Sequence, residues 1–262
     1  MRLLNVSSVE GFGPYFDEVV GTDLRQLAPQ VTSAGTGVMA GDIDVAGFDA
    51  AYVEIPLGSA VFGRVLFESL QDVNVSTNHS SAGFFAAAKK NYMFYVLRDA
   101  GVSAPSTVVA SNARSARGLD KHLDFPVVAR RLRGTKPVEK TALQSPDEVE
   151  GFAEGADEDS VLLFSNLDTG DKYRFLVAGD TVVSLTDTSD GWRFDDTCLR
   201  YSNPGSDTEE LARSAVHAVG TSVADVSVRS GEVVDIDPNP DIDLYSDAAN
   251  RDAFEAVSEA VK

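Results

Sequence analysis

The first third of the chain alternates between strand and helix patterns. Two apolar runs, LLNVSS (3–8) and FDAAYVEI (48–55), and the β-branched run VNVST (73–77) are typical of strands. Between the last two runs, apolar residues recur at helical spacing over residues 60–70. Because strands that alternate with helices usually form parallel sheets, residues 1–85 are predicted to form a small parallel α/β lobe.

The middle of the chain, residues 86–160, is predicted as a second lobe. Apolar positions over 84–100 indicate a helix, and Gly101 suits the position just after a helix end. Pro105 prevents the helix from continuing, so residues 106–111 are predicted to begin a strand.

Two more strands and one helix complete this region. PVVARRL (126–132) and VLLFS (161–165) have strand patterns, and GTKPVEK (134–140) between them is predicted as a loop. Ser145 is a suitable cap for a helix whose first position is Pro146.

Residues 161–262 are predicted as a third lobe that combines hairpins with helices. The expected elements are a hairpin over 171–187 turning at Gly179-Asp180, a helix over 208–219 with Ser206 and Glu209 as a capping box, a hairpin over 224–237 turning at Ser230-Gly231, and an amphipathic helix over 247–262. The order of elements predicts an α+β protein with a parallel sheet at its head.

The second predicted hairpin carries the most informative carboxylates. Asp225 lies in its first arm and Asp235 in its second, so antiparallel pairing brings them close together. Asp235 and Asp237 are two residues apart, and a strand presents both on one face. Carboxylates gathered in this way repel one another unless a cation neutralises them, and oxygen ligands favour Mg²⁺, Mn²⁺ or Ca²⁺ over zinc.

A solvent-exposed strand face is the alternative, because the chain is rich in aspartate. Apolar Val233, Val234 and Ile236 surround the carboxylates, and Pro238 and Pro240 follow them. Carboxylates at the end of an apolar strand favour a position at the edge of a cleft. The two interpretations stay open on spacing alone.

Five segments resemble one known family, the ATP-grasp enzymes, and in particular the RimK-like amide ligases. DIDPNP (235–240) resembles their Glu-x-Asn-x-x-Pro metal motif, and VADV (223–226) resembles Gly-Val-Asp-Ile. Residues 77–107 are similar to the family stretch that ends in Ala-Gly-Val-x-x-Pro-x-Thr. FPVVAR (125–130) resembles Phe-Pro-Val-Val-x-Lys, and residues 171–183 resemble Asp-Tyr-Arg-Val-Leu-Val-Val-Gly-Gly.

The segments follow the family's order and spacing across residues 50–245. The resemblance implies an ATP-grasp fold, in which the small parallel lobe precedes two α+β lobes that enclose a nucleotide cleft. It implies ATP and Mg²⁺ as cofactors, with Mn²⁺ as an alternative ion. A small-molecule or peptide carboxylate would be activated as an acyl phosphate and then joined to an amine.

The resemblance also implies a role for individual residues. The expected metal ligands are Asp225, Asp235 and Asp237; the expected nucleotide contacts are Lys90, Arg130, Gly134, Ser165 and Leu167; the expected catalytic arginines are Arg174 and Arg193.

The sequence departs from the family pattern at several of these positions. Arg130 replaces a lysine, and Asp235 and Asp237 replace glutamate and asparagine. The glycine-rich loop keeps only Gly134, and the adenine hinge Phe164–Leu167 lacks its acidic residue. A non-catalytic member that binds nucleotide or a partner without turnover is therefore the alternative to a ligase, and an interaction module without nucleotide is a third hypothesis.

Charge and composition indicate the partners and the solvent environment of the protein, but they do not indicate its reaction. The 262 residues carry a net charge of −19, which argues against a nucleic-acid partner. The acidic, lysine-poor composition resembles that of proteins from salt-loving archaea, in which high salt screens self-repulsion.

A single cysteine, Cys198, excludes an intrachain disulfide and suits a reducing cytoplasm. No apolar run has membrane-spanning length, and the start of the chain lacks a signal-peptide pattern, so a cytoplasmic protein without a membrane partner is expected.

Overall fold

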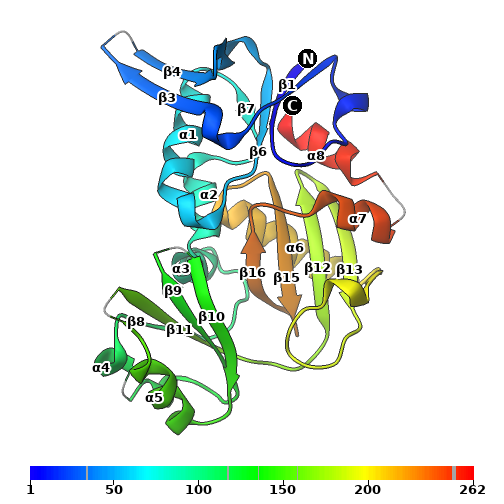
Figure 1. Ribbon diagram of the computed structural model, residues 1–262. Helices are drawn as coiled ribbons and strands as arrows, with labels where there is room; N and C mark the ends of the chain where they lie inside the picture. The colour runs from blue at the N-terminus through cyan, green and yellow to red at the C-terminus, as the bar shows by residue number, and fades with distance from the viewer. Residues whose placement is uncertain (34, 117, 135, 158, 250–251) are drawn as a thin grey trace.

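A computed structural model describes the chain except at residues 34, 117, 135, 158 and 250–251 (Figure 1). Its first sheet is parallel, with the strand order β2 (Glu18–Gly21), β1 (Arg2–Val6), β6 (Ala50–Val53) and β7 (Ser76–Thr77). The helix α1 (Ala60–Asp72) packs beside it. Because β1 and β6 are almost completely buried, they appear in the sequence as continuous apolar runs, and the predicted parallel lobe is confirmed.

A small antiparallel sheet next to this lobe was not predicted. It contains β3 (Leu27–Thr32), β4 (Gly35–Ala40) and β5 (Ile43–Asp44). Most side chains of β3 are exposed, and β4 contains two glycines, so neither strand has a regular apolar alternation. The hydrophobic pattern therefore carried little information about this sheet.

The second sheet is antiparallel and is built from the middle of the chain. Its order is β10 (Lys136–Leu143), β9 (Val127–Arg133), β11 (Ser160–Asn166) and β8 (Thr107–Ala110), and the short α4 (Ala113–Ala116) and α5 (Pro146–Glu154) cover one face. The predicted cap of α5 is confirmed, since the Ser145 hydroxyl accepts from the Glu148 N–H at 3.4 Å. β11 pairs within this sheet, so a lobe boundary at residues 160–161 cuts through a strand of the middle lobe.

The predicted loop over residues 134–140 is wrong, because most of it is the strand β10. β9 ends at Arg133 and β10 begins at Lys136, so the connection contains only two residues. Gly134 adopts a φ of +63°, a conformation that a two-residue hairpin turn requires and that glycine adopts easily. The charged residues and the proline in GTKPVEK concealed a strand that lies at the edge of its sheet.

The third sheet contains both predicted hairpins. Its antiparallel order is β14 (Leu199–Tyr201), β13 (Thr181–Asp187), β12 (Lys172–Ala178), β15 (Val223–Arg229) and β16 (Glu232–Asp237). The helices α2 (Ser81–Ala88), α3 (Lys90–Asp99) and α6 (Ser206–Val219) share its hydrophobic core. The Val-rich strands β15 and β16 thus pack one face into this core and carry their carboxylates on the other.

Three helix predictions differ from the structure. The helix expected over 84–100 is broken at Lys89 into α2 and α3. The helix α6 begins at Ser206 itself after Gly205, so the predicted capping box is wrong. The helix expected over 247–262 is two helices, α7 (Ile242–Ala249) and α8 (Ala253–Val261).

The C-terminal helices return to the first lobe. Figure 1 shows α8 beside the start of the chain, and its Phe254 stacks edge-on against Phe12 at 5.3 Å between ring centroids. Tyr245 of α7 is fully buried in the same cluster, together with Leu3 and Tyr52 of the first sheet. Among the described helices, none combines the length and apolar character needed to cross a bilayer.

A buried histidine links the first lobe to the third sheet. His79 forms a β-bridge with Thr221, its ring Nδ1 contacts the Thr221 hydroxyl, and its ring packs edge-on against Phe67 at 5.3 Å. Burial lowers the pKa of His79 to about 3, so the imidazole stays neutral in the folded protein.

We predict that His79 makes folding stability depend on pH. In the unfolded chain the histidine takes up a proton below about pH 6.5, whereas the folded protein does not until about pH 3, so stability falls as pH decreases through this window. Between pH 6.5 and 5 the contribution lost is about 2 kcal/mol. The free energy of unfolding, measured with urea at each pH, should fall less steeply with decreasing pH in His79→Gln than in wild type. His122→Gln, at an exposed position, should follow wild type. Parallel pH profiles for wild type and His79→Gln would contradict this assignment.

Candidate functional site

The β15–β16 hairpin gathers the three predicted aspartates on one face. Asp225 is directly opposite Asp237, and Ser227 is opposite Asp235. The alternate residues Val226 and Ile236 are fully buried on the other face. The three carboxylates line a single cavity with about 290 Å³ open to water, so the convergence predicted from strand pairing is confirmed.

Asp225 is already compensated by protein groups. Its carboxylate forms an ion pair with Arg174 of β12, whose Nε also donates to Oδ1 at 3.3 Å. The Tyr245 hydroxyl donates to Oδ2 at 2.8 Å. Burial raises the pKa of Asp225 despite the guanidinium, and the neighbouring carboxylates hold the pKa of Arg174 above its usual value against the effect of burial. The two groups therefore form a buried charge pair.

Asp235 lies among cations. The ammonium of Lys90, at the start of α3, contacts the Asp235 carboxylate and the Ile236 carbonyl oxygen. Burial works against the charge of Asp235, but Lys90, Arg130 and Lys140 outweigh it and lower the pKa of this carboxyl to about 2. Asp235 is thus an anion over the whole physiological pH range.

Asp237 connects the hairpin to the first lobe. Its Oδ1 accepts from the Asn239 backbone N–H at 2.9 Å. The Asn239 side chain donates to the Ile55 carbonyl at 2.9 Å and accepts from the Ile55 N–H at 3.1 Å. The end of β16 is therefore fixed to the segment that follows β6.

The donor set suits a divalent ion that also takes ligands from a nucleotide. Within the described part of the chain, no three Asp, Glu, His or Cys side chains are arranged as a complete metal-binding group. Asp235 and Asp237 nevertheless face the same cavity, whereas Asp225 is engaged by Arg174. Mg²⁺ commonly uses one or two carboxylates and completes its shell with phosphate oxygens and water, and two such carboxylates are present.

Two cations stand directly opposite each other on the second sheet. Arg130 of β9 is paired with Lys140 of β10, and both line the acidic cavity. Arg130 is 7% exposed and donates to the Val234 carbonyl at 3.4 Å, which brings the second sheet against the third. Burial and the charge of Arg130 lower the pKa of Lys140 to about 8. Like charges in directly opposed positions are unfavourable, so this pair favours a bound anion.

Sequence reasoning missed Lys140 because it placed this residue in a loop. The alternation along β10 would have revealed its position opposite Arg130 if the two-residue turn at Gly134 had been recognised. Gly134 itself lies at the tip of this hairpin and is not among the described residues that line the cavities.

The predicted hinge residues Ser165 and Leu167 line a second, narrower cavity beside the first. About 30 Å³ of it is open to water, and Arg130, Lys140, Phe194 and Val234 border both cavities. Ser165 accepts from the Thr107 hydroxyl at 3.0 Å, and the Leu167 N–H donates to the Pro126 carbonyl at 2.9 Å. The two cavities therefore form a continuous cleft with a narrow slot at one end and the three carboxylates of the hairpin at the other.

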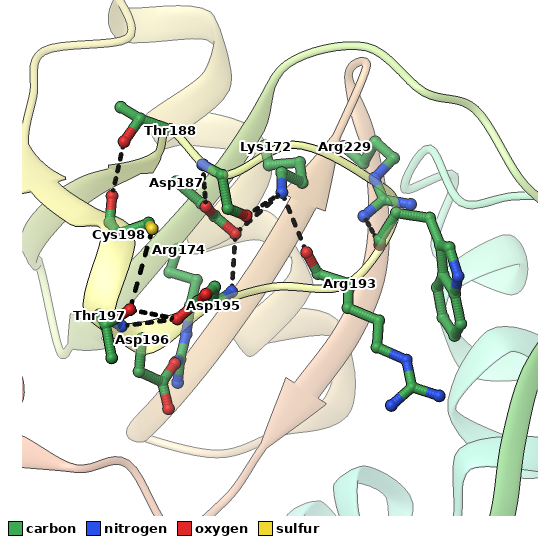
Figure 2. Close-up of polar contacts among 12 residues, drawn as sticks. Lys172, Arg174, Asp187, Thr188, Arg193, Asp195, Asp196, Thr197, Cys198 and Arg229 are labelled. Carbon is green, nitrogen blue, oxygen red and sulfur yellow. Dashed lines mark hydrogen bonds and ion pairs between the residues drawn. The ribbon is translucent and has the colours of Figure 1, made fainter.

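The segment 188–198, which contains Arg193, folds over this cleft. Figure 2 shows the Lys172–Asp187 ion pair that holds this segment, with 3.1 Å between Nζ and Oδ2. The Lys172 ammonium also donates to the Arg193 carbonyl at 3.0 Å. Arg193 Nη2 donates to the Lys140 carbonyl at 3.1 Å, and the Lys140 ammonium lies 5.5 Å from the centre of the Trp192 ring. This segment thus joins the second and third sheets across the cleft.

No family model matches the chain, and no curated protein is recognisably similar in sequence. Solved structures are similar over the whole fold. The ATP-grasp ligase PsnB complexed with a minimal precursor superposes with a TM-score of 0.75 at 14% identity, covering 99% of this chain and 97% of PsnB. A RimK domain ATP-grasp protein from Sphaerobacter thermophilus has a TM-score of 0.71 at 17% identity, covering 100% and 99% of the two chains. D-alanine–D-alanine ligase from Bacillus anthracis, complexed with ATP, has a TM-score of 0.67 at 16% identity, covering 100% and 96%. The chain has the ATP-grasp fold.

We predict that the two carboxylates that contact Arg174 differ sharply in their effect on stability. Asp225 is 2% exposed, whereas the Asp196 side chain is 66% exposed. Asp225→Asn removes the buried partner of the half-buried Arg174 guanidinium and leaves it the exposed Asp196 carboxylate, so it should lower the free energy of unfolding by about 3 kcal/mol. Asp196→Asn, the matched control, should cost less than about 1 kcal/mol. Equal losses in urea unfolding would show that Arg174 does not depend on Asp225.

Proposed function

We propose that this protein is an ATP- and Mg²⁺-dependent ligase that joins a carboxylate to an amine through an acyl phosphate. The single observation that carries the proposal is the cavity in which the carboxylates of Asp235 and Asp237 face the cations Arg130, Lys140 and Arg174. Such a combination suits a triphosphate with its metal, because the cations neutralise phosphate oxygens while the carboxylates hold the ion.

In this proposal each end of the cleft has its own task. The slot beside Ser165 and Leu167 takes the base, and Arg130 and Lys140 stand between this slot and the acidic hairpin, where the phosphates would lie. Lys90 contacts Asp235 of the acidic hairpin, and its ammonium can exchange this contact for one with a phosphate oxygen. The metal ion, held by Asp235 and Asp237, would supply charge neutralisation on the phosphates.

Arg174 is the proposed partner of the transferring phosphoryl group. A guanidinium is permanently charged and presents a planar fork of donors that fits phosphate oxygens. Asp225 and Tyr245 hold this fork in position from behind, so the arginine is oriented before substrate arrives. Asp225, assigned to the metal by the family resemblance, acts here as the residue that positions Arg174.

Closure of the cleft is the proposed task of segment 188–198. Trp192 and Phe194 line the slot, and Arg193 bonds to the opposite sheet, so this segment can exclude water from the reacting groups. Water exclusion matters for this chemistry because an acyl phosphate is readily hydrolysed.

The two substrates are proposed as a small-molecule or peptide carboxylate and an amine. PsnB was solved with the precursor peptide PsnA2 and AMPPNP, and D-alanine–D-alanine ligase was solved with ATP. These proteins share the fold at low sequence identity and lend general support to a ligase.

A nucleotide-binding protein without turnover is the second candidate. The two-residue turn at Gly134 leaves no glycine-rich loop to cradle phosphates, and this favours weakened catalysis. Turnover separates the two functions, since both predict that ATP binds with Mg²⁺.

We predict that Asp235→Asn removes the Mg²⁺ dependence of ATP binding. In wild type, calorimetric titration should show tighter ATP binding with Mg²⁺ than without it. The variant loses one of two carboxylate ligands, so its affinity with Mg²⁺ should fall by roughly tenfold or more, whereas its metal-free affinity should not fall, because Lys90 is released from its ion pair with Asp235. Asp243→Asn, on the exposed face of α7, is the matched control and should behave as wild type.

An unchanged ratio of the two affinities in Asp235→Asn would rule out this metal assignment. Turnover is then tested with hydroxylamine as a surrogate amine and a panel of amino acids and dicarboxylates as carboxylates. A ligase should form hydroxamate and ADP in equal amounts, whereas a protein that only binds nucleotide should form neither.

A further inference from the structure

The segment 188–198 borders both cavities of the cleft but has little apolar support. Residues 188–195 form neither a helix nor a strand, and most side chains of the segment are exposed. Trp192 and Phe194 are half-buried and line the slot, and Arg193 and Phe194 line the acidic cavity. Because a segment with few buried apolar contacts detaches easily, polar contacts must hold it in this position.

A buried ion pair ties both ends of the segment to the third sheet (Figure 2). Lys172, at the start of β12, is directly opposite Asp187, at the end of β13, and their side chains are 6% and 0% exposed. Asp187 accepts from the Ser189 N–H at 2.8 Å through Oδ1 and from the Asp195 N–H at 2.9 Å through Oδ2. One carboxylate therefore binds the backbone near the beginning of the segment and again near its end.

Two buried cations hold the middle of the segment from the same sheet. The Lys172 ammonium donates to the Ser189 hydroxyl at 2.7 Å and to the Arg193 carbonyl at 3.0 Å, and it also contacts Asp187, so each of its three donors has a partner. Arg229, which is 4% exposed, donates to the Trp192 carbonyl. The backbone of the residues that face the cleft is thus fixed by side chains of β12 and β15.

The ionised state of Asp187 suits this role. Burial opposes its charge, but hydrogen bonds from Ser189 and Asp195 and the ammonium of Lys172 outweigh burial and lower the pKa of Asp187. The carboxylate therefore stays charged at physiological pH. Hydrogen bonds to a charged acceptor are stronger than those between neutral groups, so the backbone of the segment is held firmly.

The contacts of the segment with the opposite sheet are weaker. The exposed side chain of Arg193 donates to the Lys140 carbonyl at 3.1 Å, and the Lys140 ammonium lies 5.5 Å from the centre of the Trp192 ring. A contact made by an exposed charged side chain contributes less than a buried ion pair with several hydrogen bonds. When the cleft widens, the segment should therefore stay with the third sheet.

We infer that Lys172 and Asp187 are positioning residues, which hold the segment 188–198 on the third sheet as a fixed wall of the cleft before substrates arrive. The inference rests on the ligase function proposed above. A fixed wall keeps water away from the acyl phosphate while the amine approaches. The ion pair thereby affects the outcome of the reaction without touching a substrate.

A detached wall would allow a wasteful side reaction. The oxygen of a water molecule then attacks the acyl-phosphate carbon in place of the amine. The C–O bond to phosphate breaks, phosphate leaves with the electron pair, and the two protons of water pass to phosphate and to solvent. The original carboxylate is restored, so ATP is consumed although no amide is formed.

The fluorescence of Trp192, the single tryptophan of the chain, reports on the segment directly. The test variant combines Lys172→Met with Asp187→Leu, since apolar groups of similar shape can replace a buried ion pair with little loss of stability. In the nucleotide-free protein, acrylamide should quench Trp192 more strongly in this variant than in wild type. The population with a detached segment should rise by roughly a hundredfold or more, because several backbone groups lose charged partners.

Turnover with hydroxylamine separates positioning from a merely structural role. Wild type should release one ADP for each hydroxamate, whereas the double variant should release more ADP than hydroxamate. Ser184→Ala is the matched control, because Ser184 is buried on the same strand and its hydroxyl donates to Glu209 at 2.8 Å, not to the segment. This control should keep the wild-type quenching and the wild-type ratio.

Equal quenching of Trp192 in wild type and the double variant, or an unchanged ratio of ADP to hydroxamate, would overturn the inference. If the double variant does not fold, Ser189→Ala decides by the same readouts, because it removes only the Ser189 hydroxyl that Lys172 contacts. Stronger quenching in the variant, with no hydroxamate from wild type, keeps the positioning role and removes the ligase proposal. Hydroxamate from wild type with equal quenching removes the positioning role alone.

Discussion

Charge compensation across the β15–β16 hairpin is the constraint on which the site depends. Strand pairing forces Asp225, Asp235 and Asp237 onto one face of the third sheet, and the opposite face must stay apolar to form the core. Counter-charges stabilise such a face, because carboxylates that are partly withdrawn from water lose solvation and repel one another. Arg174 of β12 and Lys90 of α3 supply counter-charges to Asp225 and Asp235.

In the proposed function, the same constraint would allow a nucleotide to enter the cleft. A metal ion bound to a triphosphate carries both positive and negative charge. It can therefore become the ion-pair partner of the carboxylates and of the cations that pair with one another in the free protein. Lys90 would exchange a carboxylate for a phosphate oxygen, and Asp235 would exchange an ammonium for the metal. Arg174 keeps its support from Asp225 and Tyr245 throughout, which suits a residue that must be oriented before chemistry begins.

The sequence predicts those parts of the molecule whose signal is local. The buried strands β1 and β6, the two hairpins and the convergence of the aspartates follow from apolar runs, turn residues and a two-residue period. Lys140 could not be found in this way, because its role depends on a tight turn and on pairing with Arg130. Tyr245 was missed for a different reason, since its contact with Asp225 depends on how α7 packs in the core that it shares with the first lobe.

The most direct test is a crystal structure of the protein with Mg²⁺ and a non-hydrolysable ATP analogue. The proposed function predicts the base in the slot beside Ser165 and Leu167, phosphates against Arg130 and Lys140, and an ion between the phosphates and the carboxylates of Asp235 and Asp237. A structure in which the analogue lies elsewhere, while Lys90 still contacts Asp235 and no ion touches β16, would contradict it.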